Sequence, residues 1–373
     1  MTTTTARWRG ELGSVAVPIG VAQALSVGGW VLATVATRHL LGSRVRPLQY
    51  HGVLGWVSWD GGFYRLITEQ GYASTSPESI RFFPLYPMLA KLVRVPLGGN
   101  TDLALLVIAK VAVVVAAVGI HRLVTHEGGA DRLARRTIWC WVLFPGAFVL
   151  SWAYSEALLV ALAAWCIWAL RSKRWLLAAL LALLAGLCRP IGIALAAAAL
   201  VEVLRDRQDA PWRSWLARSA AVAAAPLGAA AFCAYSAARG FGLWAPLSSQ
   251  DELRHTETPF QRIWSMPSEL VGHDAFTTGL HVPFVVGFLV LLVLAFRRLP
   301  GAYSAYAAVV LAGALSAQNL NSVERYAMSA FPLAMALAVL IARDERLEST
   351  TYSVGGALTI GLCALALCGA FVP

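Results

Sequence analysis

Long apolar segments recur along the whole chain, and each suits a helix that crosses a membrane. A hydrocarbon core about 30 Å thick takes about 20 helical residues. Of 373 residues, 58% are hydrophobic and only 13% are charged, which is unlike a soluble domain. Alternating strand patterns are absent, so we predict an all-α, polytopic membrane protein. The main apolar runs are 15–36, 103–124, 219–238, 281–296, 302–317, 327–342 and 352–372.

Two further apolar segments, 137–170 and 175–204, are too long for one span and short for two. Because positively charged loops stay in the cytoplasm, each segment should enter and leave on the same side. We therefore predict turns at 151–157 and 188–192. The whole pattern predicts about eleven spans, with the N-terminus inside and the C-terminus outside. The basic residues around these two segments are Arg132, Arg135, Arg136, Arg171, Lys173, Arg174, Arg205, Arg207, Arg213 and Arg218.

The remaining segments are predicted to be external loops of one integral-membrane domain, 1–373. They are a first loop at 37–102, a second at 239–279 and the short segment 321–326. The first loop keeps many basic residues, which favours an anionic ligand on that side. The alternative is that long loops simply escape the charge rule.

Two amphipathic stretches in the first loop are typical of helices that lie in the membrane interface. In one, Trp56, Trp59, Phe63 and Leu66 recur at spacings of three and four. The other covers 81–93 and should be interrupted by its two prolines, at positions 84 and 87.

Several common functions leave no trace in the chain. The six cysteines lack metal-type spacing, and no Gly-rich phosphate loop or Walker motif occurs. His255 and His273 are interpreted as ordinary loop histidines, and no DxD occurs in the first loop. The net charge of +10 is explained by cytoplasmic loops near anionic lipid, without nucleic acid. We expect no cofactor and no metal ion.

Polar residues gather at the predicted external membrane edge, where each needs a partner or a function to offset its cost. Arg189 stands between two apolar halves, so it serves either a function or an ion pair with Glu156. Asp60 is either functional or a helix cap. The set comprises Asp60, Tyr64, Arg81, Tyr154, Glu156, Arg189, Gln250, His255, Asn321, Glu324, Arg325 and Tyr326.

One carboxylate with fixed arginines suits the transfer of a sugar from a lipid phosphate to an alcohol. The acceptor hydroxyl must lose a proton to a base, while the phosphate leaves as an anion without a general acid. A glycoside hydrolase would need a matched pair of carboxylates. The planar guanidinium of arginine suits the leaving phosphate better than lysine does.

Five stretches, in this order, resemble the PIG-V-like mannosyltransferases, bacterial relatives of the second GPI mannosyltransferase. The resemblance implies a GT-C glycosyltransferase fold, with an external active site and a polyprenyl-phosphate-mannose donor. The acceptor would be a glycolipid, a glycan or a protein hydroxyl, and the enzyme would sit in the plasma membrane. The stretches are WDGGFYRLITEQGY, FFPLYP, AYSEALLVALAA, CRPIG and ERY.

The same resemblance assigns roles to individual residues. It implies that Asp60 is the catalytic base of an inverting transfer and that Arg189 and Arg325 bind the donor phosphate. The hydroxyls that the family usually has around its glutamate and RP motifs are partly missing here. Residues expected to support the site or to bind substrate are Trp59, Tyr64, Arg81, Tyr154, Glu156, Gln250 and Tyr326.

Two other functions stay open at this point. A lipid or sugar transporter or flippase would show paired broken helices and internal repeats, and we find no repeat. A non-catalytic membrane scaffold would tolerate alanine at Asp60, Arg189 and Arg325.

Overall fold

A computed structural model describes residues 2–41, 53–207, 212–254, 257–269, 278–317 and 319–369. Within these ranges the chain is helical and forms no β-sheet, so the predicted all-α, multi-pass architecture is confirmed. Five helices are long and apolar enough to cross a membrane, or up to six if one bent pair counts as a span. The count of eleven stays a prediction. The five are Gly10–His39, Thr101–His126, Ser214–Ala238, Gly279–Arg298 and Glu345–Leu367.

In chain order the α-helices are α1 (Thr2–Val35), α2 (Asp60–Gln70), α3 (Leu85–Val93), α4 (Thr101–His126), α5 (Asp131–Val142), α6 (Glu156–Arg171), α7 (Trp175–Cys188), α8 (Ala194–Arg205), α9 (Trp212–Ala238), α10 (Ala245–Arg254), α11 (Pro259–Glu269), α12 (Val282–Arg298), α13 (Gly301–Ala314), α14 (Val323–Ser329), α15 (Pro332–Ile341) and α16 (Glu345–Leu367). The short helices are η1 (Ala36–Leu41), η3 (Val53–Gly55), η4 (Tyr72–Ser74), η5 (Pro77–Arg81), η6 (Ala147–Ser151), η7 (Pro190–Ile193) and η9 (Thr278–His281).

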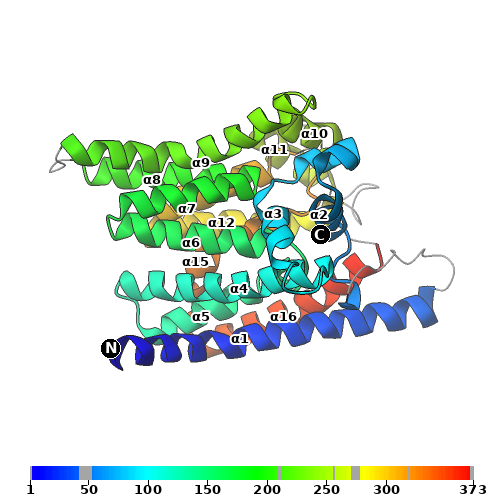
Figure 1. Cartoon of the computed structure of the whole chain (residues 1–373). Helices are drawn as coiled ribbons and strands as arrows, with labels where there is room; N and C mark the ends of the chain where they lie inside the picture. Colours follow the sequence, from blue (N-terminus) through cyan, green and yellow to red (C-terminus); the bar gives the residue numbers. More distant parts are fainter. Residues whose placement is uncertain are drawn as a thin grey trace.

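The long helices lie roughly side by side in one bundle (Figure 1). α1 packs against α16 and α4, α4 against α6, α6 against α7, and α7 against α9. The helices of the two predicted external loops, α2, α3, α10 and α11, gather at the end of the bundle away from the N-terminus (Figure 1).

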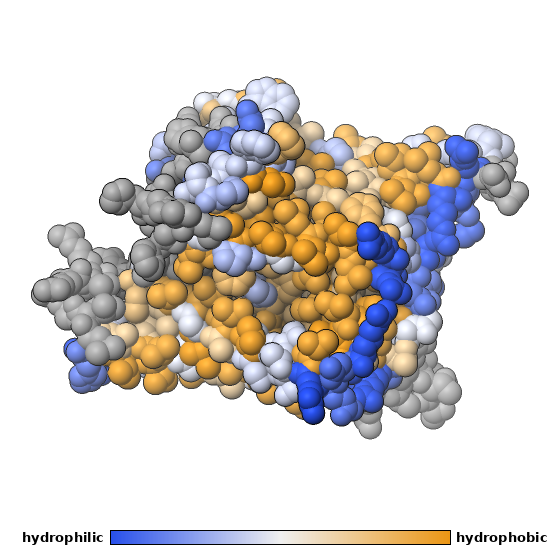
Figure 2. Space-filling model, turned by 180° about the vertical axis from the view of Figure 1, so that it is seen from behind, coloured by the Kyte–Doolittle hydropathy of each residue, from blue (hydrophilic) through white to orange (hydrophobic). Residues whose placement is uncertain are grey.

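The predicted cytoplasmic loops meet at the opposite end, where ion pairs join them. Arg171, at the end of α6, contacts Glu127 after α4 at 2.7 Å and Glu202 on α8 at 3.0 Å. Arg122 on α4 contacts Glu11 on α1 at 2.9 Å. Figure 2 shows hydrophilic residues along this end and hydrophobic residues over the middle of the face. These ion pairs hold the ends of α1, α4, α6 and α8 at one end of the bundle, and the assignment of this end to the cytoplasm stays a prediction.

Both long apolar segments break at or next to their predicted turns. The first apolar segment breaks between α5 and α6, and residues 151–157 carry the chain from η6 into α6. The second breaks after α7, where Arg189 adopts an extended conformation (φ −157°, ψ 152°). Pro190 follows, and a residue before proline is disfavoured in a helix, which explains why α7 ends here.

The two helices of the first loop begin later than their sequence patterns predict. α2 starts at Asp60, so Trp56 and Trp59 precede it rather than belonging to its stripe. α3 starts after Pro84, with Pro87 in its first turn, where the missing N–H of proline costs nothing. The two prolines therefore start this helix instead of interrupting it.

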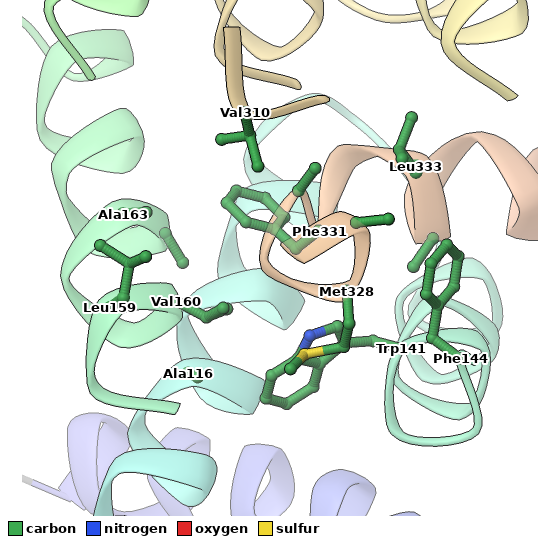
Figure 3. Close-up of a cluster of buried hydrophobic side chains, with 14 of the residues drawn as sticks. Ala116, Trp141, Phe144, Leu159, Val160, Ala163, Val310, Met328, Phe331 and Leu333 are labelled. Carbon is green, nitrogen blue, oxygen red and sulfur yellow. The ribbon is translucent and has the colours of Figure 1, made fainter. Parts of the chain in front are cut away.

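The chain bends by 82° between α14 and α15. Phe331 lies in the bend and fills the core between α5, α6 and α13, close to Trp141 and Met328 (Figure 3). The Tyr306 hydroxyl donates to the Ser329 carbonyl at 3.1 Å. A broken helix is stable in an apolar interior only when such freed carbonyls find partners.

Glycines allow α7 and α9 to approach closely. A Cβ on Gly186 would lie 2.1 Å from the Ala225 carbonyl oxygen, and one on Gly228 would lie 2.3 Å from that of Leu183. These contacts are between backbones, which cannot move aside as a flexible side chain would.

We expect Gly186→Ala to lower the thermal unfolding midpoint in detergent, because overpacking a tight contact costs about 1–3 kcal/mol. The matched control is Gly287→Ala on α12, where a Cβ meets nothing within 4 Å. Equal midpoints for the two variants would contradict the close α7–α9 contact.

Candidate active site

Asp60 is the first residue of α2 and reaches the site from a strained turn. Trp59 before it has a positive φ of 55° with ψ −124°, a rare conformation for a residue with a side chain. Trp59 takes the cap position without a side-chain hydrogen bond, so the cap interpretation of Asp60 is wrong. The Asp60 side chain is 21% exposed, which keeps it open to a ligand.

Asp60 begins a line of alternating charges. Its Oδ2 accepts a hydrogen bond from Arg325 Nη1 at 2.5 Å. Arg325 Nε lies 3.2 Å from Glu156 Oε1, and the same oxygen accepts from Arg189 Nη1 at 2.7 Å. The side chains of Glu156, Arg325 and Arg189 are 1%, 4% and 9% exposed. We call these four residues the charge line.

Helix starts and breaks bring the charge line together. Glu156 opens α6, where the helix dipole favours a carboxylate. Arg189 lies in the extended break after α7, and Arg325 lies on the short α14. Gly146 leaves room for the backbone of Arg325, because a Cβ on Gly146 would lie 2.7 Å from the backbone nitrogen of Arg325.

Hydroxyl and aromatic groups surround the two arginines. Arg189 Nη1 also donates to Ser155 Oγ at 3.0 Å, and Ser155 Oγ lies 2.6 Å from the Tyr64 hydroxyl. The Arg325 guanidinium lies over the Tyr154 ring at 5.3 Å and the Tyr326 ring at 5.4 Å. Stacked aromatic rings favour arginine over lysine at such positions.

Several polar atoms in and beside the charge line are buried without a hydrogen-bond partner in the described part of the chain. Among them are Glu156 Oε2, Arg325 Nε and the Tyr154 hydroxyl oxygen. Buried unpaired polar groups are costly, so such atoms mark a place where a bound molecule can supply partners.

The remaining predicted site residues differ in their surroundings. Arg81 lies over the rings of Phe63 at 5.0 Å and Phe82 at 4.9 Å. The Trp59 indole donates to the Ala366 carbonyl at 3.1 Å, which ties the start of α2 to α16. Gln250 lies on α10, and its side chain is outside the described part of the structure, as are the residues His255 and His273.

The charges around Asp60 keep it ionised. Burial by itself would raise the pKa of Asp60, but the positive charges of Arg325, Arg189 and Arg81 and the hydrogen bond from Arg325 outweigh it. The net result is a pKa below the ordinary value of 3.8. Burial also raises the pKa of Tyr64, which therefore keeps its proton.

Sequence reasoning did not single out Lys110 or the roles of Ser155 and Gly146. Lys110 Nζ donates to the Ser151 carbonyl at 2.7 Å and lies 4.4 Å from the Trp56 ring, next to the segment that leads into Glu156. The available signal was a lysine inside an apolar run, since charges in such runs are rare and expensive.

No group of three or more His, Cys, Asp or Glu side chains that could hold a metal ion occurs in the described ranges. The charge line offers two carboxylates to its arginines and is formally neutral. Two buried guanidinium groups can bind a phosphate, and a partly exposed carboxylate can accept a proton.

The Mannosyltransferase (PIG-V) family profile matches residues 41–241, which is more than half of the chain. The chain belongs to this family. The matched segment contains Asp60, Glu156 and Arg189, and Arg325 joins them in space from outside it. No curated protein sequence matches the chain.

Among solved structures, the chain is similar to the oligosaccharyltransferase of Archaeoglobus fulgidus. A crystal structure with zinc and sulfate has a TM-score of 0.44 and 14% identity, covering 94% of this chain and 53% of that chain. The archaeal enzyme AglB with an inhibitory peptide and dolichol-phosphate has a TM-score of 0.46 and 12% identity, covering 95% and 56%. This chain thus spans little more than half the length of these proteins.

We expect Glu156→Gln to destabilise the protein strongly, because it leaves two buried arginines short of negative charge. Breaking a buried ion pair costs about 3–5 kcal/mol, against about 0–1 kcal/mol for an exposed pair. The control is Glu345→Gln, since the Arg132–Glu345 pair is 69% and 89% exposed. Unfolding midpoints in detergent compare the two, and a larger loss from Glu345→Gln would refute the buried pairing.

Proposed function

We propose that this protein is a membrane mannosyltransferase that moves mannose from a polyprenyl-phosphate-mannose donor to an acceptor hydroxyl at the external face. Asp60 takes the proton of the acceptor hydroxyl as its oxygen forms a bond to the anomeric carbon. The bond between that carbon and the phosphate oxygen breaks on the opposite side, so the configuration inverts. No metal ion or cofactor takes part.

The observation that carries this proposal is the hydrogen bond between Asp60 and Arg325, with Arg189 held beside them through Glu156. A carboxylate and two arginines thus lie in one site, which supports a reaction that needs a base and two cations to bind a phosphate. The family match supports a sugar as the transferred group.

Arg325 and Arg189 would bind the donor phosphate and stabilise its growing charge as the sugar leaves. A phosphate oxygen that takes hydrogen bonds from Arg325 competes with Asp60 for the same nitrogen. Glu156 contacts both arginines through Oε1 and keeps them in place. Donor binding thus weakens the hydrogen bond between Arg325 and Asp60, so the Asp60 carboxylate becomes available to accept a proton.

The unpaired atoms of Glu156 and Tyr154 support a polar sugar in the site. A sugar hydroxyl can donate to Glu156 Oε2 and accept from, or donate to, the Tyr154 hydroxyl. The lipid part of the donor would stay in the membrane, along the apolar outer face of the bundle. Glycolipids, glycans and protein hydroxyls remain as acceptor classes, and profiling mannosylated products in cells that lack the protein would distinguish them.

A second candidate function is favoured by the 82° break between α14 and α15, because transporters place such broken helices at their binding sites. The candidate is a lipid flippase without sugar transfer. Radiolabelled donor and purified protein in detergent decide between the two, since a flippase forms no mannosylated product there. Lipid translocation in proteoliposomes without any transfer would decide for the flippase.

We expect Asp60→Asn to reduce the rate of mannose transfer by about 10²–10⁴-fold, the usual contribution of a general base. Donor binding should persist, because both arginines remain. The control is Asp102→Asn, an acid at the start of α4 that is 25% exposed and contacts Arg65 at 3.4 Å. Near-normal transfer by Asp60→Asn would remove Asp60 from the mechanism.

We also expect kcat/KM for transfer to stay flat as the pH falls from about 7.5 to about 5, since this parameter reports the ionisation of the free enzyme. A lowered pKa keeps Asp60 ionised over this window, and the loss would come only below its ordinary value of 3.8. Arg81→Met removes one of the lowering charges and should move the acid limb to higher pH. An acid limb centred near pH 6 in the unmodified protein would contradict an ionised Asp60 base.

A further inference from the structure

Ser155 has an unusual place for a serine before a helix. It occupies the cap position of α6, where a serine hydroxyl normally accepts a hydrogen bond from the first turn. Here the side chain makes no such bond. Its hydroxyl instead contacts Arg189 at 3.0 Å and Tyr64 at 2.6 Å, and the residue is fully buried.

The hydrogen bonds around Ser155 fix one end of the Arg189 guanidinium. An arginine only donates, so Ser155 Oγ is the acceptor in this contact. Arg189 Nη1 has two hydrogens, and it directs one to Ser155 Oγ and the other to Glu156 Oε1. Two acceptors on one nitrogen set the tilt of the guanidinium plane as well as its position.

Tyr64 links this arrangement to the helix of Asp60. It lies four residues after Asp60, so the two side chains share one face of α2. The Tyr64 ring is held edge-on against Phe82 at 5.1 Å and Tyr86 at 4.9 Å and is 2% exposed. A ring held in this way can hardly rotate or shift, so the Tyr64 hydroxyl holds the Ser155 hydroxyl in one position.

We propose that Ser155 is a positioning residue that sets Arg189 relative to Asp60, through its hydrogen bond to Tyr64 on the helix of Asp60. This inference rests on the proposed function, because Arg189 is taken to bind the phosphate of the lipid donor. Ser155 fixes the position of Arg189 relative to Asp60 without contacting the substrate. Tyr64 acts through Ser155 in the same way.

The first test compares Ser155→Ala with Ser155→Thr in the purified full-length protein. We expect Ser155→Ala to lower kcat for mannose transfer by about 10-fold, the usual cost of a lost hydrogen bond to a charged group. Ser155→Thr keeps the hydroxyl and should restore most of the rate. The control is Ser304→Ala, a buried serine on α13 whose hydroxyl has no partner in the described part of the chain.

A binding measurement separates this inference from the proposed function. Polyprenyl phosphate without a sugar should bind about 10-fold more weakly to Ser155→Ala than to the unmodified protein, with little change for Ser304→Ala. If the unmodified protein transfers no sugar, the proposed function fails, and the binding comparison still tests Ser155. If it transfers mannose and Ser155→Ala matches it in both kcat and binding, the inference about Ser155 is wrong.

Tyr64→Phe tests the hydrogen bond between Ser155 and α2, and it replaces the first test if Ser155→Ala fails to fold. It removes only the hydroxyl, and we expect it to slow transfer while leaving the unfolding midpoint near that of Tyr86→Phe. Tyr86 is the matched control, since its buried hydroxyl donates to the Leu105 carbonyl at 2.8 Å instead. The double variant Ser155→Ala/Tyr64→Phe should be no slower than Ser155→Ala alone. Independent, multiplying effects of the two substitutions would overturn the link.

Discussion

The pairing of two buried arginines with two carboxylates is the interaction around which this protein is organised. Neither Arg189 nor Arg325 can be buried alone in an apolar bundle, because an uncompensated charge there costs several kcal/mol. Glu156 contacts both of them, and Asp60 supplies the second negative charge from the exposed side. The four residues come from four separate segments, so their mutual attraction requires those segments to meet at one place.

The interruptions of the helices follow from this requirement. A continuous helix pairs its own backbone groups and spreads its side chains along its length. Where a helix breaks or begins, its unpaired backbone groups and side chains can meet those of other segments at one place. The bundle breaks at Arg189 and again after α14, and it begins helices at Asp60 and Glu156. Gly146 and the strained Trp59 serve the same end, since both allow the backbone to come close to the site.

The sequence predicted the helical class, the turns at 151–157 and 188–192 and the common side of the basic loops, because hydropathy and charge act locally. The structure also brings Asp60, Glu156, Arg189 and Arg325 together, as expected from the order of their motifs. The start of α2 was placed too early, since aromatic spacing does not reveal a strained turn. The part played by Ser155 was out of reach, because a serine before a helix normally predicts a cap.

The distance along the chain between the partners has a consequence for how the protein is made. Asp60 and Arg325 lie 265 residues apart, and the indole of Trp59 is fastened to α16 across 307 residues. During synthesis the first loop leaves the ribosome long before its partners exist. The charge line is therefore complete only after α14 has been made, and the contact of Trp59 forms only after α16 has been made.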